Sequence, residues 1–307
     1  MKTIVTHPVN FHPDDVFGTA ALLLLLKKTA PKEKIKVLRS TDPKIWAKGD
    51  FVLDIGRQYA PAKDLFDHHQ EGGAGARSNG GIPYASFGLI WKKYGKKIAG
   101  SASLAEYVDE KLVSVIDADD NGVSLYSPTR EDVQPILLES YVYMKVHEAR
   151  AIVAKTKNKK DFDRVFMKLL PWAEDIILGF IQKGIRREAA KKLALKVYSK
   201  AKDKKIIIMD EYIGFDFSEF PEPLVTVYPD LRTPGNWAAK SVQSGTVDKS
   251  DLRFRFPESW RGKNTPEELA RACGVADATF CHNSGFLAVA GSKEGVLEMV
   301  RKGISML

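Results

Sequence analysis

The amino-acid sequence predicts an α/β protein with two lobes that are joined by a helical segment. Short strand-like apolar runs alternate with helical patterns over the first 130 residues and again after residue 203. Between these parts the apolar residues show helical spacing, with many lysines and arginines between them. We therefore predict a domain with a parallel sheet at 1–130, a basic helical connector at 131–203 and a smaller α/β domain at 204–307.

The first lobe is expected to begin with a strand at residues 3–6 and an apolar helix at 14–28. Further strands are expected at 35–39, 51–55 and 65–67. Because strands and helices alternate, we expect these strands to form a parallel sheet. Functional residues of such sheets gather at the carboxyl ends of the strands.

The rest of the first lobe and the connector are expected to be mostly helical. The glycine-rich residues 71–81 predict a mobile loop. Helices are expected at 84–94 and 102–116, and the acidic residues 117–122 are interpreted as a helix exit or turn. Helical spacing then continues through most of 131–200.

The second lobe shows four strand-like runs and a final helix, for which Ser292 is the expected N-cap. The strands are expected at residues 206–209, 224–228, 278–281 and 286–290, and the helix at 292–301.

The formal net charge of +8 is unevenly distributed along the 307 residues. Between Lys145 and Lys205 there are 18 Lys or Arg against 7 Asp or Glu, whereas the rest of the chain has 29 against 32. The densest basic runs are residues 155–160 and 200–205. Such a segment can attract a polyanion such as nucleic acid, or it can be the solvated face of a lysine-rich helix; composition alone does not separate these interpretations.

Several classes of protein do not fit this sequence. The longest uncharged apolar run, residues 19–26, is too short to span a bilayer. The first residues lack the apolar stretch and cleavage site of a signal peptide. Cys273 and Cys281 form no C-x-x-C pair and no disulfide framework. We therefore expect a cytoplasmic protein without a membrane partner.

Histidines and aspartates are concentrated at the expected strand ends of the first lobe. Four of the six histidines lie within the first 69 residues. A single one would be explained as a surface or core residue, and a single aspartate as a helix cap or turn residue. Together, imidazoles and carboxylates are the ligand set of a transition-metal site. The candidates are His7, His12, Asp14, Asp54, Asp67, His68 and Asp117.

Seven candidate ligands are more than one ion needs. They suit two divalent ions about 3.5–4 Å apart that share a carboxylate, the arrangement known for phosphoryl displacement. Without cations, the aspartates would repel one another strongly. Mixed nitrogen and oxygen ligands favour Mn²⁺, with Mg²⁺, Co²⁺ and Zn²⁺ as alternatives.

The tripeptide Asp67-His68-His69 resembles the signature that gives the DHH phosphoesterase superfamily its name. The other three signature blocks of that superfamily are matched in chain order. They are His7 with His12-Pro13-Asp14, then Asp54-Ile55-Gly56, and Asp117 in the acidic run 117–122.

Within that superfamily the chain resembles the MYG family, whose members are often labelled metal-dependent protein hydrolases. The resemblance rests on Thr6-His7, on Phe11-His12, and on the later runs 252–262 and 280–286. It covers nearly the whole chain and implies a DHH-type catalytic domain followed by a smaller substrate-binding domain. A eukaryotic member of the family is described as a 3′→5′ RNA exonuclease.

The resemblance implies a division of the ligands between two ions. His7, His12 and Asp54 would bind one ion, with Asp54 bridging to the second. The second ion would be held by Asp14, Asp54, His68 and Asp117. Many superfamily members have an aspartate at the position of His12, and this difference can change the metal preference.

The resemblance also implies catalytic roles for Asp54 and the DHH tripeptide. Asp67 would be a ligand or would orient His68. His69 would contact the substrate phosphate or a leaving oxygen. We interpret Asp15 as a helix N-terminal charge, and Asp120 as a turn residue or a partner of the ligands.

In the superfamily, the smaller lobe closes over the metals and holds the substrate. Arginine forks bind phosphate through two hydrogen bonds, and a glycine-containing turn can present backbone N–H groups to it. Arginines that alternate along a strand can also simply face solvent. The substrate-binding candidates are His69, Arg232, Arg253, Arg255, His282, Ser284 and Gly285.

The leading hypothesis is a two-metal phosphodiesterase, a 3′–5′ exoribonuclease or oligoribonuclease that releases nucleoside monophosphates from RNA or short oligonucleotides. The alternative is a phosphatase or phosphodiesterase of a small molecule, such as a cyclic dinucleotide or a nucleoside phosphate. A third hypothesis is a non-catalytic nucleic-acid-binding protein, which would bind with a steep salt dependence. The sequence also leaves a homodimer open.

Overall fold

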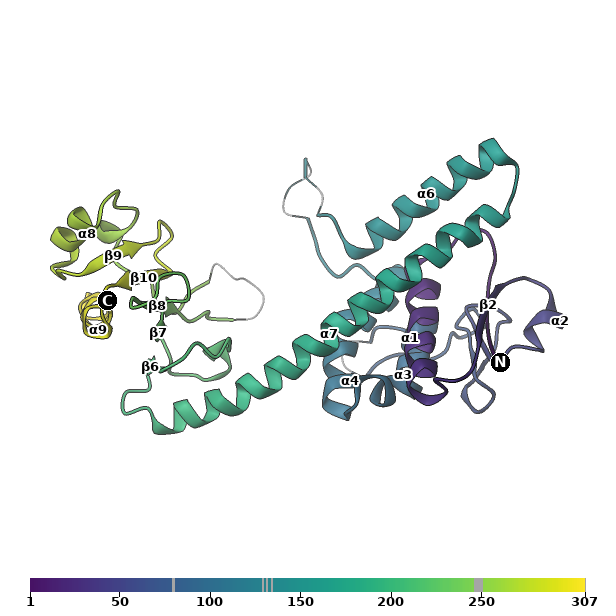
Figure 1. The fold of residues 1–307 in the computed structure, drawn as a ribbon, viewed down its shortest axis with the longest axis horizontal. Helices are drawn as coiled ribbons and strands as arrows, with labels where there is room; N and C mark the ends of the chain where they lie inside the picture. The colour runs from purple at the N-terminus through teal and green to yellow at the C-terminus, as the bar shows by residue number, and fades with distance from the viewer. Residues whose placement is uncertain (79–80, 129, 131, 134, 246–250, 307) are drawn as a thin grey trace. The chain divides into compact units, whose positions relative to one another are not determined.

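The computed structural model describes residues 1–78, 81–128, 130, 132–133, 135–245 and 251–306 (Figure 1). The described residues form a mixed α/β fold with two five-stranded sheets, which confirms the predicted fold class. The chain divides into two compact units, one up to Ile185 and the other from Arg186 onward.

The sheet of the first unit has the strand order β2-β1-β3-β5-β4. Its strands are β1 (Lys2–Thr6), β2 (Ile35–Arg39), β3 (Phe51–Leu53), β4 (Tyr59–Ala60) and β5 (Leu65–Phe66). The four strands predicted here are all present and parallel, and β4 adds an antiparallel edge strand. The carboxyl ends of β1, β3 and β5 therefore lie along one edge of the sheet.

Two long helices cover this sheet and share the main core. Helix α1 (Pro13–Thr29) is buried along most of its length, as its run of leucines predicts. It packs against α3 (Ser86–Ala99), where the rings of Phe17 and Phe87 lie 5.8 Å apart. Leu53 of β3 is fully buried in the same core. This packing fixes the start of α1 against the strand ends.

A third helical stretch follows α3. It runs from α4 (Ala102–Val108) through a π-helical turn at Asp109–Val113 into α5 (Ser114–Asp120). The acidic residues 117–122 were expected to form a helix exit or turn, and they do, since 117–120 are the last turn of α5 and 121–122 the turn that follows. The side chains of 117–120 consequently follow helical spacing, which matters for the site.

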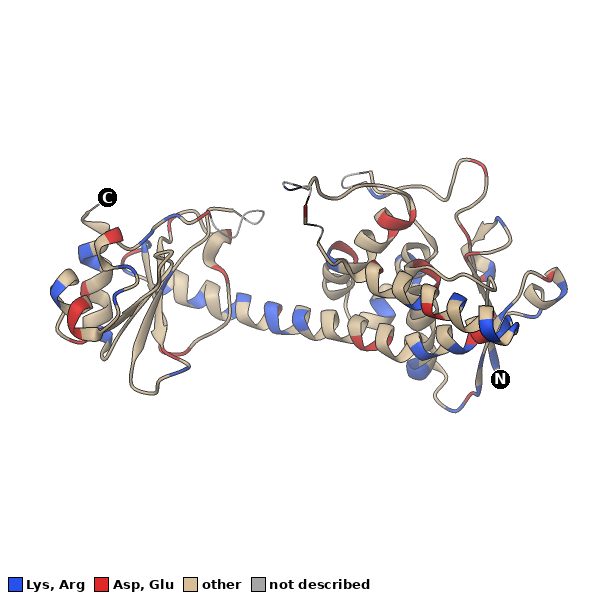
Figure 2. Ribbon diagram, turned by 90° about the horizontal axis from the view of Figure 1, so that it is seen from above, with Lys and Arg blue, Asp and Glu red and all other residues tan. Residues whose placement is uncertain are grey.

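The predicted helical character of 131–200 is also confirmed, by α6 (Leu138–Thr156) and α7 (Lys160–Lys200). Helix α7 carries many basic side chains along its length (Figure 2). Short helices at α2 (Pro43–Trp46) and η1 (Pro61–Lys63) connect strands of the first sheet. Nowhere in the described parts of the chain is there a helix with the length and apolar character needed to cross a membrane.

The sheet of the second unit has the order β6-β7-β8-β10-β9. Its strands are β6 (Ile206–Ile208), β7 (Val225–Pro229), β8 (Trp237–Ser241), β9 (Ala278–Cys281) and β10 (Leu287–Ala290). Strand β8 lies in the centre of the sheet but was not predicted, because alanine and lysine have low strand propensity. Only β6 and β7 pair in parallel.

Helices α8 (Pro266–Cys273) and α9 (Lys293–Ile304) complete the second core, with short 3₁₀ turns at η3 (Phe217–Glu219) and η4 (Glu258–Trp260). The hydroxyl of Ser292 accepts a hydrogen bond from the backbone N–H of Gly295 at 3.0 Å. The predicted N-cap of the last helix is thereby confirmed.

The packing of α1 predicts opposite effects of two glycine-to-alanine substitutions. A Cβ at Gly18 would lie 2.8 Å from Leu53 Cδ1 and 3.2 Å from Ile90 Cδ1, whereas a Cβ at Gly179 in α7 would meet no atom within 4 Å. Gly18→Ala should destabilise the protein by about 1–3 kcal/mol. Gly179→Ala should stabilise it by about 0.5–1 kcal/mol through helix propensity. Chemical denaturation measures both, and a neutral Gly18→Ala would contradict the described packing.

Candidate metal centre

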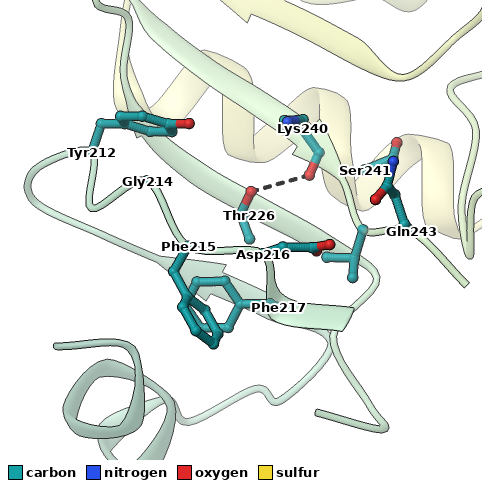
Figure 3. A pocket seen from close by; sticks show the side chains of 10 residues that line it. Tyr212, Gly214, Phe215, Asp216, Phe217, Thr226, Lys240, Ser241 and Gln243 are labelled. Atoms are coloured by element: carbon teal, nitrogen blue, oxygen red, sulfur yellow. Dashed lines mark hydrogen bonds between the residues drawn. The ribbon is translucent and has the colours of Figure 1, made fainter. Parts of the chain in front are cut away.

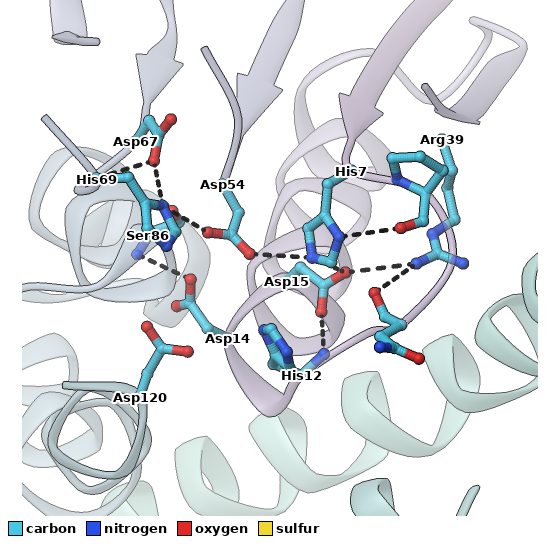
Figure 4. Close-up of polar contacts among 12 residues, drawn as sticks. His7, His12, Asp14, Asp15, Arg39, Asp54, Asp67, His69, Ser86 and Asp120 are labelled. Carbon is cyan, nitrogen blue, oxygen red and sulfur yellow. Dashed lines mark hydrogen bonds and ion pairs between the residues drawn. The ribbon is translucent and has the colours of Figure 1, made fainter. Parts of the chain in front are cut away.

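The loops that leave three parallel strands carry the candidate ligands. His7 follows β1 directly, Asp54 follows β3, and Asp67 follows β5. Asp14 lies in the first turn of α1, which begins near the same edge of the sheet (Figure 4). Parallel topology therefore brings together residues that are up to 60 positions apart in the sequence.

The first ligand group consists of His7, His12 and Asp54, whose candidate ligand atoms all lie within 4.8 Å of one another. His7 Nε2 is 3.2 Å from Asp54 Oδ2. Its other ring nitrogen, Nδ1, lies 3.2 Å from the carbonyl oxygen of Pro8. A proton on Nδ1 would donate to that carbonyl and leave Nε2 free as a ligand atom.

The second ligand group consists of Asp14, His68 and Asp120. His68 Nε2 lies 3.1 Å from Asp120 Oδ2 and 3.6 Å from Asp54 Oδ1. Asp54 also forms a third group with His68 and His69. The two oxygens of Asp54 therefore face different groups, Oδ2 toward His7 and Oδ1 toward His68, which is the arrangement that a bridging carboxylate needs.

Asp14 connects this centre to the neighbouring helix. Its fully buried carboxylate accepts hydrogen bonds from the backbone N–H groups of Ser86 at 3.0 Å and Phe87 at 2.6 Å. These are the first N–H groups of α3, so the negative charge also interacts favourably with the helix dipole. Nevertheless, burial and the nearby carboxylates of Asp120 and Asp54 raise the pKa of Asp14 well above its ordinary value.

Buried polar atoms without hydrogen-bond partners test whether cations fit this site. Among the described side chains, His7 Nε2, His68 Nε2 and Asp54 Oδ1 are buried and lack such a partner. The carboxylate of Asp54 is an ionic neighbour of His7 Nε2 and of His68 Nε2, but neither contact is a hydrogen bond. A buried atom in this state is costly unless something else coordinates it. Divalent cations would satisfy all three atoms at once.

The charge balance supports the same fit. Burial lowers the pKa of His7, but Asp15 and Asp54 raise it to about 11. Burial likewise lowers the pKa of His68, which Asp120 and Asp54 raise to about 11. The aspartates thus draw protons onto the imidazoles when no other cation neutralises them. Bound divalent ions would supply that positive charge and release the protons.

Asp67 is positioned to orient His69. Its oxygens accept hydrogen bonds from the backbone N–H groups of Arg57, His68 and His69, at 2.5 Å, 2.7 Å and 3.1 Å. Oδ1 also lies 2.8 Å from His69 Nδ1. Although burial raises the pKa of Asp67, these contacts hold it below the ordinary value. Asp67 belongs to none of the ligand groups found among the described residues.

Asp117, which the sequence placed among the ligands, is engaged elsewhere in the structure. Its Oδ2 forms a 2.7 Å ion pair with Arg77, and its Oδ1 accepts a hydrogen bond from Gly88 N at 3.0 Å. A Cβ at position 88 would overlap Asp117, so this approach requires glycine. Asp120, one helical turn later, reaches His68 instead. The geometry therefore favours Asp120 over Asp117 as a ligand.

Arg77 is a structural residue that sequence reasoning missed. It is 8% exposed and also binds Asp109 through Nε at 2.8 Å and Nη2 at 2.7 Å. Asp109 opens the π-helical turn before α5. Arg77 therefore fastens the glycine-rich stretch, which was expected to be mobile, to the helix that presents Asp120. Residues 79–80 of that stretch lie outside the described part.

A second buried arginine supports the loop between His7 and His12. Arg39 Nη2 donates to the carbonyl oxygens of Val9 at 3.1 Å and Asn10 at 3.3 Å, while Nη1 pairs with Asp163 of α7 at 3.1 Å. Val9 has a φ of 68°, which is costly for a β-branched residue. The arginine holds this strained loop in place.

In the second unit, the guanidinium of Arg253 is hydrogen-bonded to backbone carbonyl groups. Nη1 donates to the carbonyl oxygens of Phe220 and Pro223, and Nη2 donates to that of Ser218 at 2.8 Å. The guanidinium thus holds the turn around η3, which gives Arg253 a structural role. The exposed Arg232 lies 3.4 Å from Asp230 in a turn.

The other candidates of the second unit surround a tight turn. Ser284 N donates to His282 Nδ1 at 3.1 Å, and Ser284 O accepts from Arg255 at 2.7 Å. Gly285 has a φ of 70°, and a Cβ there would lie 2.6 Å from Arg261 Nε, so the turn requires glycine. Arg255 and Ser284 border a pocket of about 260 Å³, lined also by Lys240, Ser241, Gln243, Leu252 and Phe286.

A neighbouring pocket of about 180 Å³ shares Lys240, Ser241 and Gln243 with the previous one (Figure 3). It is bordered on its other side by the segment from Tyr212 to Phe217. The carbonyl of Lys240 accepts a hydrogen bond from Thr226 across the sheet at 3.2 Å. The second unit therefore offers concave surfaces with polar groups around β8, the strand that the sequence did not reveal.

Fold and site together define an α/β protein with a candidate dinuclear metal centre at the carboxyl edge of a parallel sheet. The family model MYG1_exonuc, described as "Uncharacterised protein family (UPF0160)", matches residues 3–304. The chain belongs to this family.

Relatives from distant organisms match over nearly the full chain. A MYG1 protein of Schizosaccharomyces pombe is 26% identical over 324 residues, covering 98% of this chain and 97% of the relative. A MYG1 protein of Chlamydia muridarum is 24% identical over 318 residues, covering 97% and 94%. A protein of Mus musculus named MYG1 exonuclease is 26% identical over 328 residues, covering 97% and 83%.

The two aspartates of α5 give a test of the ligand assignment. Asp120→Asn should weaken Mn²⁺ binding at least about tenfold, because a ligand is lost. Its effect on the stability of the ion-free protein should be small, because relief of the repulsion with Asp14 offsets loss of the pair with His68. Asp117→Asn should instead lower stability by about 1–3 kcal/mol, because Arg77 keeps Asp109 but loses its charge-assisted hydrogen bond to Asp117. Calorimetric titration with Mn²⁺ and thermal unfolding in a chelator measure the two effects. The reverse pattern would restore Asp117 as the ligand.

Proposed function

We propose that this protein is a metal-dependent phosphodiesterase that removes nucleoside monophosphates from the 3′ end of RNA or short oligonucleotides. The observation that carries the proposal is the pair of ligand groups that meet at Asp54. Two divalent ions held in this way are the established device for displacement at phosphorus. The name of the mouse relative, MYG1 exonuclease, and the resemblance to the DHH superfamily support the same chemistry.

His7, His12 and Asp54 would hold one ion. Asp14, His68 and Asp120 would hold the other, with Asp54 shared. The mixed nitrogen and oxygen donors favour Mn²⁺. When bound, the ions would neutralise charge on the phosphodiester and make the attacking water more acidic. The negative charge of the aspartates would favour the binding of two dications. Burial of these carboxylates would strengthen the electrostatic interaction between ions and ligands, because little water screens it.

His69 is suited to donate a proton to the leaving oxygen. Its side chain is 55% exposed, and its Nδ1 faces Asp67. The hydrogen bond that His69 Nδ1 donates to Asp67 is the main cause that raises the pKa of His69 above its ordinary value. The imidazolium form is therefore favoured, with Asp67 accepting the Nδ1 proton and Nε2 carrying the proton to be transferred. Asp67 would thus hold His69 in the orientation that an acid catalyst needs.

Other features support a nucleic-acid substrate. The basic segment between Lys145 and Lys205 can attract the phosphate backbone of a chain longer than one nucleotide. In the second unit, Arg255 and Ser284 border a pocket that Lys240 also lines, and we propose these residues and His282 as substrate contacts. A small phosphorylated substrate would need only the metal centre, so dependence of the rate on chain length distinguishes the two substrate classes.

Substitution of the shared carboxylate tests the proposed chemistry. With Mn²⁺ present, the protein should shorten end-labelled RNA, and Asp54→Asn should lower kcat about 100-fold or more, since both ion sites lose a ligand. Glu110→Gln is the matched control, because this carboxylate is exposed in the same unit and should be neutral. Product analysis on RNA, DNA and dinucleotides reports polarity and substrate class. Full activity of Asp54→Asn would refute the proposal.

The pH dependence of the rate tests the role of His69. Because the protonated form acts as the acid, kcat/KM should fall as pH rises through the pKa of His69. Asp67→Asn removes the carboxylate that raises this pKa, so the alkaline limb should move to lower pH. His69→Gln should remove the limb and lower the rate about 10²- to 10⁴-fold. An unmoved limb in Asp67→Asn would exclude this assignment.

A further inference from the structure

A pocket of about 470 Å³ lies between α5 and α6, outside the ligand groups already described. Its wall is mainly apolar and aromatic, with Val123, Leu125 and Tyr126 each more than a third exposed. Two acidic side chains, Asp119 and Glu139, stand on the same wall. Exposed apolar groups that gather in a concave surface are typical of ligand sites.

The pocket adjoins the candidate metal centre within the first unit. Asp119 precedes the proposed ligand Asp120 on α5 and is close enough to interact electrostatically with Asp120 and His12. The hydroxyl of Tyr143 on α6 donates to Asp119 Oδ2 at 3.1 Å and fixes its carboxylate. Asp119 therefore links the wall of the pocket to the helix turn that carries the proposed ligand Asp120.

The lining determines which group fits. The residues that line the pocket include Asp119 and Glu139 but no Lys or Arg, so ionised carboxylates on its wall disfavour phosphate. Its carboxylate oxygens can only accept hydrogen bonds while they are ionised. Tyr126 and the aliphatic side chains offer a surface on which a flat ring can stack. The complementary ligand is a neutral aromatic heterocycle that carries N–H donors.

We propose that this pocket binds the terminal nucleobase of the substrate, and that Asp119 and Glu139 select bases with an exocyclic amino group. Guanine, adenine and cytosine present such donors, whereas uracil does not. The inference rests on the proposed function, because only a nucleotide substrate would place a base beside the metal centre. It adds a base preference, which the metal centre alone would not produce.

Nucleoside binding tests the pocket without any hydrolysis. Guanosine, adenosine, cytidine and uridine are titrated into the full-length protein in a chelator, so that neither phosphate nor metal contributes. The first three should bind more tightly than uridine. Tyr126→Ala should weaken their binding about tenfold through loss of stacking, and Glu139→Gln should remove the preference over uridine. The matched controls Leu178→Ala and Glu110→Gln replace exposed residues outside the pocket and should change nothing.

A kinetic comparison separates this inference from the proposed function. RNAs that differ only in the terminal base should show a lower kcat/KM for uracil, and the difference should disappear in Glu139→Gln. Hydrolysis without base dependence, together with equal nucleoside binding by Tyr126→Ala and the unaltered protein, would overturn the pocket assignment alone. Nucleoside binding that needs Tyr126 in a protein that cleaves no RNA would support the pocket and overturn the proposed function.

Discussion

Repulsion among buried carboxylates around Asp54 is the constraint on which the rest of the first unit depends. Asp14 and Asp54 are almost completely buried and lie near Asp120, so their charges cannot be left to solvent. Protonated imidazoles of His7 and His68 neutralise part of this negative charge, and the carboxylates therefore raise the pKa values of both histidines. The arrangement is most favourable when divalent cations replace those protons, so the charge that would oppose folding becomes the source of metal affinity.

The surrounding fold holds this unfavourable cluster together. Helix α3 directs its first N–H groups at Asp14, and the loop after β5 directs three backbone N–H groups at Asp67. Buried Arg39 fixes the strained loop before α1, and buried Arg77 fixes α5 through Asp117. Arg39 and Arg77 form no hydrogen bond to a proposed ligand, yet they fix the loop and the helix that carry His12 and Asp120.

Sequence patterns revealed those features that follow from local periodicity. The four parallel strands, the apolar α1 and the Ser292 cap were predicted because each has a strong local signal. The choice between Asp117 and Asp120 was not predictable, because both lie on one face of α5 and only the approach of Gly88 and Arg77 separates them. Strand β8 was missed because its residues have helical propensity and only its neighbours impose the extended form. The structural role of Arg253 was not predictable either, because the carbonyl groups that it binds are distant in the sequence.

The central claim is that two cations share Asp54, and crystals grown with Mn²⁺ test it most directly. Anomalous scattering counts the bound ions and identifies their ligands. The account predicts two peaks, one contacted by His7 and His12 and the other by Asp14, His68 and Asp120, with one oxygen of Asp54 or both contacting each ion. A single peak, a second ion bound by Asp117, or a site in which Asp54 contacts no ion would contradict it.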